Sequence, residues 1–155
     1  MARSRGFTLI ELVVVVMILS ILVGIGIPQY QRVVENSRAD DATAMVNMVA
    51  QANKMYDLNN PGSWGTSGNA VDNNNPLVVA NYLGQQNWGS QCYSYYVCNP
   101  SNGGGGGCCG GGLTGCATRA SSGACAGNGA YTAWGYTVSN TGTITPLNNA
   151  PTPAN

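Results

Sequence analysis

An apolar run of 21 residues, from Phe7 to Ile27, constrains this chain more than any other feature. Its residues are almost all Leu, Ile, Val, Met or Gly, and Glu11 is the one ionisable side chain within it. At about 1.5 Å per residue, a helix of this length covers roughly 30 Å, the thickness of the hydrocarbon core of a bilayer. The run therefore predicts a helix that can span a membrane.

The charges on either side of the run predict its orientation. Arg3 and Arg5 precede it, whereas Arg32 and Glu35 follow it. The positive-inside rule then keeps the first residues in the cytoplasm and sends the rest of the chain outward. A secretory signal peptide, cleaved after its apolar part, is the alternative. No A-x-A cleavage site follows the run, which favours an anchor that stays attached.

A second helical pattern continues directly from the apolar run. Apolar residues spaced by three and four mark one side of a helix: Ala42, Met45, Val49, Ala52 and Tyr56. The turn-forming residues Asn59 to Gly62 then end it. Without a break, one helix of about 52 residues runs from Phe7 to Leu58. Its first half has no partner within the chain, so lipid or other copies of the chain must cover it.

The remaining residues, 59–155, predict a small β-rich head, so the fold class is α+β. We expect strands at Gln91 to Val97 and Tyr131 to Val138, which are rich in Tyr, Val, Thr and Trp, and an edge strand at Gly142 to Pro146. A loop from about Asn59 to Gly89 would join helix and sheet. Between Asn99 and Ala130, 12 of 32 residues are glycine, and we expect no regular structure there without outside support.

Six cysteines favour an oxidising compartment and predict disulfides that staple the small head. They are Cys92, Cys98, Cys108, Cys109, Cys116 and Cys125. Among the 15 pairings that six cysteines allow, we consider Cys92 with Cys98 across a turn, and Cys108 or Cys109 with Cys116 or Cys125. A zinc site is the rival interpretation, which the lack of His and of any C-x-x-C motif disfavours.

The composition argues against several classes of function. The 155 residues include six basic, six acidic and no His residues, and from Asn73 onward Arg119 is the only charged side chain. We therefore expect no nucleic-acid surface, no enzyme active site, and neither a metal nor a cofactor. The head is rich in Asn, Ser, Thr and Tyr, so Trp64, Trp88 and Trp134 could stack on a sugar, although core positions are the simpler interpretation.

The N-terminus resembles that of type IV pilins and of the related pseudopilins of type II secretion. Behind a short basic leader stands Gly6-Phe7-Thr8-Leu9-Ile10-Glu11, and the apolar run ends Ile27-Pro28-Gln29-Tyr30-Gln31. The resemblance covers about the first 55 residues. It implies the pilin fold, in which a long N-terminal helix packs on a small antiparallel sheet, and a structural protein without an active site.

The resemblance also implies how the chain is divided and processed. Residues 1–6 would be a leader, 7–30 the transmembrane and assembly half of the helix, 31–58 its amphipathic half and 59–155 the head. A prepilin peptidase would cut between Gly6 and Phe7, because only a minimal side chain fits before the cut. It would then methylate the new amine of Phe7.

Three residues, Thr8, Glu11 and Pro28, are the candidate assembly residues. A carboxylate in hydrocarbon is costly unless paired, and the amine of Phe7, in the same or a neighbouring subunit, is the cation available to Glu11. Pro28, together with Gly24 and Gly26, lowers the helix stability at the end of the run. The resemblance implies that the region from about Ser20 to Pro28 unwinds in a filament, and a kinked helix is the alternative.

The expected partners follow from the resemblance. They are copies of the chain in a helical filament, the prepilin peptidase, an inner-membrane assembly platform with its ATPase motor, and membrane lipid before assembly. The subunit would cross the bacterial inner membrane once and then join an extracellular pilus used for adhesion, motility or surface attachment.

Two other functions compete with the pilus. One is a type II secretion pseudopilin, whose major members carry a carboxylate-ligated calcium site in the C-terminal region. The absence of any Asp or Glu from Asn73 onward argues against a major pseudopilin and leaves a minor pseudopilin as an alternative. The other is a membrane-anchored sugar-binding domain.

Overall fold

The computed structural model describes residues 7–65, 68–102, 107–120, 125, 129 and 131–153. Internal contacts divide the chain into two units, residues 1–36 and 37–155, which we describe separately. Helix α1, Leu9–Asn59, contributes to both. Its 51 residues confirm the single long helix expected from the sequence, and its ends lie within two residues of the expected ones.

In the first unit, every described side chain from residue 7 to residue 33 is exposed. This part of α1 is long and apolar enough to cross a membrane. The helix continues through Pro28 without interruption, so the segment from Ser20 to Pro28 is helical in the isolated chain. A Cβ atom added to Gly24 or Gly26 would meet no atom within 4 Å, so no packing within the chain requires glycine at either position.

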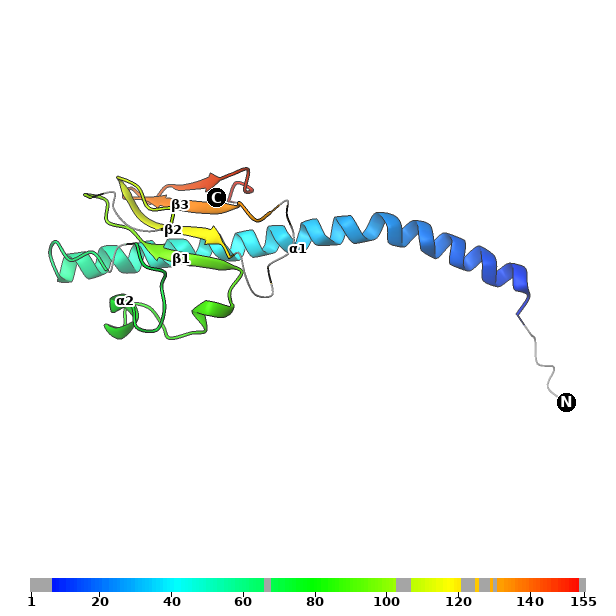
Figure 1. The fold of residues 1–155 in the computed structure, drawn as a ribbon, viewed down its shortest axis with the longest axis horizontal. Helices are drawn as coiled ribbons and strands as arrows, with labels where there is room; N and C mark the ends of the chain where they lie inside the picture. Colours follow the sequence, from blue (N-terminus) through cyan, green and yellow to red (C-terminus); the bar gives the residue numbers. More distant parts are fainter. Residues whose placement is uncertain are drawn as a thin grey trace. The chain divides into compact units, whose positions relative to one another are not determined.

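The second unit contains a four-stranded antiparallel sheet with the order β1-β2-β3-β4 (Figure 1). The strands are β1 (Tyr93–Val97), β2 (Leu113–Arg119), β3 (Gly135–Ser139) and β4 (Ile144–Leu147). Each strand pairs with the next along the chain, so the sheet is a simple meander. The expected strands are confirmed, with β1 and β3 beginning two and four residues later than predicted.

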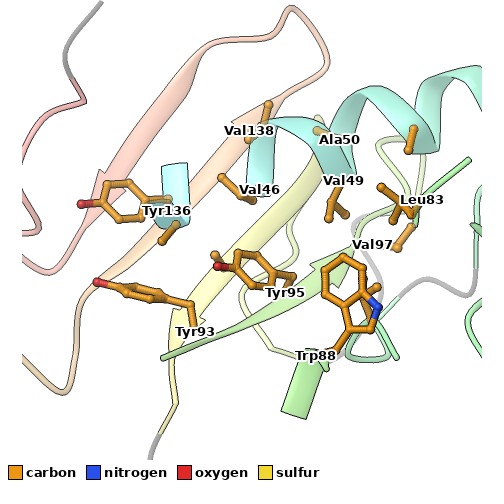
Figure 2. Close-up of a cluster of buried hydrophobic side chains, with 14 of the residues drawn as sticks. Val46, Val49, Ala50, Leu83, Trp88, Tyr93, Tyr95, Val97, Tyr136 and Val138 are labelled. Carbon is orange, nitrogen blue, oxygen red and sulfur yellow. The ribbon is translucent and has the colours of Figure 1, made fainter. Parts of the chain in front are cut away.

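The core lies between the C-terminal half of α1 and one face of this sheet. The predicted helical stripe is confirmed, since Ala42, Val49 and Ala52 are buried, and Met45 and Tyr56 pack partly buried against the same cluster. Figure 2 shows Val46, Val49 and Ala50 of the helix among Tyr95, Tyr136, Val138 and Trp88. Burial raises the pKa of the hydroxyls of Tyr95 and Tyr136, and the neighbouring Tyr93 adds to both shifts. These phenols therefore stay neutral in the core.

The glycine-rich segment contains a central strand that we did not expect. Strand β2 lies within it and pairs with β1 on one side and with β3 on the other. Its glycine at position 115 has a packing role, because a Cβ atom there would lie 3.2 Å from Cβ of Ala50. The absent side chain lets the strand lie directly against the helix. Residues 113–119 were not among the expected strands, and two neighbouring strands supply there the outside support that local composition requires.

The expected loop between helix and sheet contains two short helical segments, α2 (Pro76–Val79) and the 3-10 helix η1 (Trp88–Ser90). Asn75 caps α2, because its side-chain oxygen accepts a hydrogen bond of 3.0 Å from the N–H of Leu77. Leu77 and Trp88 are buried and belong to the core cluster. Both short helical segments therefore help to cover the core.

Glycine at position 135 provides a test of the sheet's packing. A Cβ atom there would lie 2.8 Å from the carbonyl oxygen of Ala117 on β2, and neither backbone can yield easily. We expect Gly135→Ala to lower the free energy of unfolding by about 2 kcal/mol. Gly84→Ala is the matched control, because its Cβ atom would enter open space. Denaturant titration of both variants measures the effect, and equal stability of Gly135→Ala and wild type would contradict this packing.

Candidate assembly site and disulfide cluster

The first residues of α1 form a closed set of hydrogen bonds between Thr8 and Glu11. The backbone N–H and the hydroxyl of Thr8 both donate to Oε2 of Glu11, each at 2.8 Å. The backbone N–H of Glu11 donates in turn to Oγ1 of Thr8 at 3.3 Å. This reciprocal arrangement is a capping box, which satisfies N–H groups that the first turn of a helix leaves free. Thr8 and Glu11 therefore fix where the helix begins.

The carboxylate of Glu11 keeps one oxygen available. All of its hydrogen bonds to described residues go through Oε2, and those residues provide no partner for Oε1. In this chain, which still carries residues 1–6, the nitrogen of Phe7 is part of a peptide bond and has no charge. An ion pair between Glu11 and the amine of Phe7 therefore requires cleavage before Phe7. Gly6, on the other side of that bond, lies outside the described residues.

The other candidate residue, Pro28, lies farther along the same exposed helix. With Ile25, Gln29 and Arg32 it lines a surface hollow of about 300 Å³. A second groove of about 540 Å³ lies beside Gly26, where the missing side chain leaves room, and it is lined by Leu22, Val23, Gly26, Ile27, Tyr30 and Gln31. Pro28 is thus part of an apolar surface and is separated along the helix from Thr8 and Glu11.

Residues 1–27 match the prokaryotic N-terminal methylation motif. The match includes Gly6, Phe7, Thr8 and Glu11, the positions on which the expected processing and assembly depend. At its N-terminus the chain is therefore similar to prepilins of the type IV pilin and pseudopilin class. The apolar helix and the motif together fit a subunit anchored in a membrane. No solved structure matches the chain significantly.

Three disulfides connect the six cysteines of the head, and none of the cysteines is free. The bridges are Cys92–Cys125, Cys98–Cys109 and Cys108–Cys116. The expected pairing of Cys92 with Cys98 was wrong, because these residues flank the five-residue strand β1 at opposite ends. Such a strand spans roughly 16 Å, well beyond the Cα separation of about 7 Å that a disulfide tolerates. Of the other pairs considered, the structure contains Cys108–Cys116.

Two of these bridges lie side by side. The sulfur atoms of Cys98, Cys109 and Cys116 all lie within 4.8 Å of one another. Cys109 and Cys116 belong to different bridges, yet their sulfur atoms are only 3.7 Å apart. Each of the three sulfurs is bound in a disulfide, so in this oxidised form the cluster has no thiolate to offer a metal ion.

The residues considered for sugar binding are mostly in the core. Trp88 and Trp134 are buried, and Trp64 is half-buried. Arg119, the one charged residue beyond Asp72, is also buried, and its guanidinium carbon lies 5.4 Å from the ring centre of Tyr93. Trp88, Trp134 and Arg119 are therefore core residues of the head.

Sequence reasoning missed one residue that organises the head, Asn53. Its side chain is fully buried; its amide nitrogen donates to the carbonyl oxygens of Cys98 and Thr114, each at 2.9 Å. Its amide oxygen accepts a hydrogen bond of 3.1 Å from the N–H of Gly65. The signal in the sequence is a polar residue four positions after Val49, within the apolar stripe.

Proposed function

We propose that this chain is a structural subunit of a type IV pilus that assembles through the apolar half of α1. The observation that carries the proposal is the complete exposure of residues 7–33, most of which are apolar. A surface of this kind must be covered by lipid or protein. Lipid would cover it before assembly, and the same segment of neighbouring subunits would cover it in the filament.

Glu11 gives this assembly its specificity in the proposed mechanism. Prepilin peptidase cuts between Gly6 and Phe7 on the cytoplasmic side, which creates an amine at Phe7 that the enzyme methylates. In the filament, Oε1 of Glu11 accepts this amine from an adjacent subunit while Oε2 stays bonded to Thr8. Because both charges are buried among apolar helices there, each is costly without the other, and only the correct stagger of subunits pairs them.

Pro28 and the two glycines serve the same assembly in this proposal. The segment from about Ser20 to Pro28 is helical in the isolated chain but has few intrinsic helix formers at its end. It can therefore unwind or kink at low cost when neighbouring helices pack around it. The grooves beside Gly26 and Pro28 would receive apolar side chains from those neighbours.

The proposal includes the location and partners of the subunit. The processed chain spans the inner membrane once, with its N-terminus in the cytoplasm, until a membrane platform and its ATPase motor extract it into an extracellular filament. A pseudopilin role is less well supported, because the head offers no carboxylate from Asn73 onward for the calcium site of major pseudopilins. Shearing filaments from cells and identifying their subunit distinguishes a pilus from a secretion apparatus.

Processing can be tested directly by intact-mass analysis of the protein from membranes or filaments. We expect a mature chain that begins at methylated Phe7. Gly6→Val should retain the six-residue leader, since a branched side chain precedes the scissile bond, and it should remain in the membrane. A mature chain beginning near Ile27 would instead show that the apolar run is a cleaved signal peptide.

A further inference from the structure

Two adjacent disulfides tie the loop between β1 and β2 to the end of β1 and to β2 itself. Cys98 follows β1, and Cys116 lies within β2 opposite Tyr96; both are fully buried. Cys108 and Cys109 lie in the connecting loop and are half-buried. Each of the two bridges therefore joins a half-buried residue to a fully buried one.

The backbone around these sulfurs is held firmly on several sides. The amide of Asn53 fixes the carbonyl oxygens of Cys98 and Thr114, and the N–H of Cys98 donates to the same oxygen of Thr114 at 3.2 Å. Gly107, just before the loop cysteines, packs so closely on the ring of Tyr96 that a Cβ atom there would lie 2.9 Å from it. The short distance between Cys109 and Cys116 is thus built into the fold.

We propose that Cys98, Cys109 and Cys116 form a thiol–disulfide exchange site, at which a small monothiol that opens the Cys108–Cys116 bridge makes Cys109 change partner from Cys98 to Cys116. The proposal does not depend on pilus assembly. It rests on the 3.7 Å between the sulfur atoms of Cys109 and Cys116, which places a latent nucleophile beside a second disulfide.

The exchange proceeds in two balanced steps. In the first step, the thiolate of the monothiol attacks the sulfur of the half-buried Cys108 and forms a bond with it. The Cys108–Cys116 bond breaks, and Cys116 leaves as a thiolate. Once free, the Cys116 side chain rotates into line with the Cys98–Cys109 bond and its thiolate attacks the sulfur of Cys109. The Cys109–Cys116 bond forms, the Cys98–Cys109 bond breaks, and the thiolate of Cys98 takes a proton from water. Two disulfides exist before and after the steps, so no net oxidation or reduction occurs.

The exchange changes the strand to which Cys109 covalently ties the loop. In the structure, Cys109 ties the loop to the end of β1, and after exchange it ties the loop to β2. The Cys92–Cys125 bridge begins at the other end of β1 and takes no part. The monothiol remains on Cys108, which makes this half-buried position the site of modification.

The variant Cys108→Ser tests the second step without any added thiol. It leaves Cys116 without its partner, so its thiolate should attack Cys109 and release Cys98. The purified full-length protein is held in detergent at mildly alkaline pH, quenched with acid, unfolded and alkylated, and the labelled residues are located by mass spectrometry. We expect label on both Cys98 and Cys116. Cys125→Ser is the matched control, in which the free Cys92 lies outside the cluster and should carry all of the label.

The wild-type protein with limiting glutathione tests the whole sequence and does not depend on the folding of a variant. We expect glutathione on Cys108 together with a free thiol on Cys98, and a rate that rises about tenfold per pH unit below the pKa of the attacking thiol. Glutathione on Cys108 with the free thiol confined to Cys116, or label confined to Cys116 in Cys108→Ser, would overturn the proposal.

Discussion

Replacing Glu11 by valine is expected to give a subunit that is inserted, processed and folded but does not enter filaments. Removal of a carboxylate from the apolar run makes membrane insertion at least as favourable as before. The hydrogen bonds of Glu11 go to Thr8, within the first turn of α1, so the head should fold normally. The scissile bond before Phe7 is unchanged, so cleavage should continue. Assembly should fail because the incoming amine of Phe7 would enter the filament core unpaired.

Two further variants separate the charge of Glu11 from its capping role. Glu11→Gln keeps an oxygen that can accept from Thr8 but removes the charge, and it should fail in assembly like valine. Thr8→Ala removes the hydroxyl from the capping box but keeps the carboxylate, so filaments should form in reduced amount. Each variant is expressed as the only copy, and membrane level, leader processing and sheared filaments are compared. A normal filament yield from Glu11→Val would contradict the pairing.

The helix could be predicted from the sequence because its signals are local, and the capping box at its start has an equally local signal. The apolar run, the spacing from Ala42 to Tyr56 and the turn at Asn59 each determine one feature of α1 by themselves. The motif likewise places Thr8 and Glu11 three residues apart, which is the spacing of a capping box. No knowledge of distant contacts was needed for either result.

Strand β2 and the disulfide pairing could not be predicted because their causes are distant in sequence. By its local sequence, glycine at position 115 argues against a strand. Glycine is needed there because a larger residue would crowd Ala50 of the helix, which lies 65 positions earlier in the chain. Cys92 and Cys98 are close in the chain but are held apart by the strand between them. Cys92 precedes β1 and Cys125 follows β2, so their bridge depends on how these two strands pair.

Asn53 illustrates most clearly how the distant parts of the head depend on one another. One side chain joins the helix to the end of β1, to β2 and to the loop at Gly65. Considered from the helix alone, an asparagine at a buried position is unfavourable, because its amide is costly to remove from water without hydrogen-bond partners. The residue is stabilising only because three backbone groups from separate segments satisfy it at once.

Replacing Asn53 by alanine is therefore expected to cause a large loss of stability in the head. The variant leaves the carbonyl oxygens of Cys98 and Thr114 and the N–H of Gly65 without this partner. We expect the free energy of unfolding to fall by about 3 kcal/mol, and urea titration followed by tryptophan fluorescence reports it, since Trp88 and Trp134 lie in the core.

Asn47→Ala is the matched control for this prediction. Asn47 lies on the same helix, but within the described part of the chain its side chain takes part in one exposed hydrogen bond, accepted from Gln51 at 3.4 Å. Its replacement should change the free energy of unfolding by no more than about 0.5 kcal/mol. If Asn53→Ala were equally mild, water would have to reach all three backbone groups, and the junction of helix, strands and loop would not be the closed core that the burial of Asn53 implies.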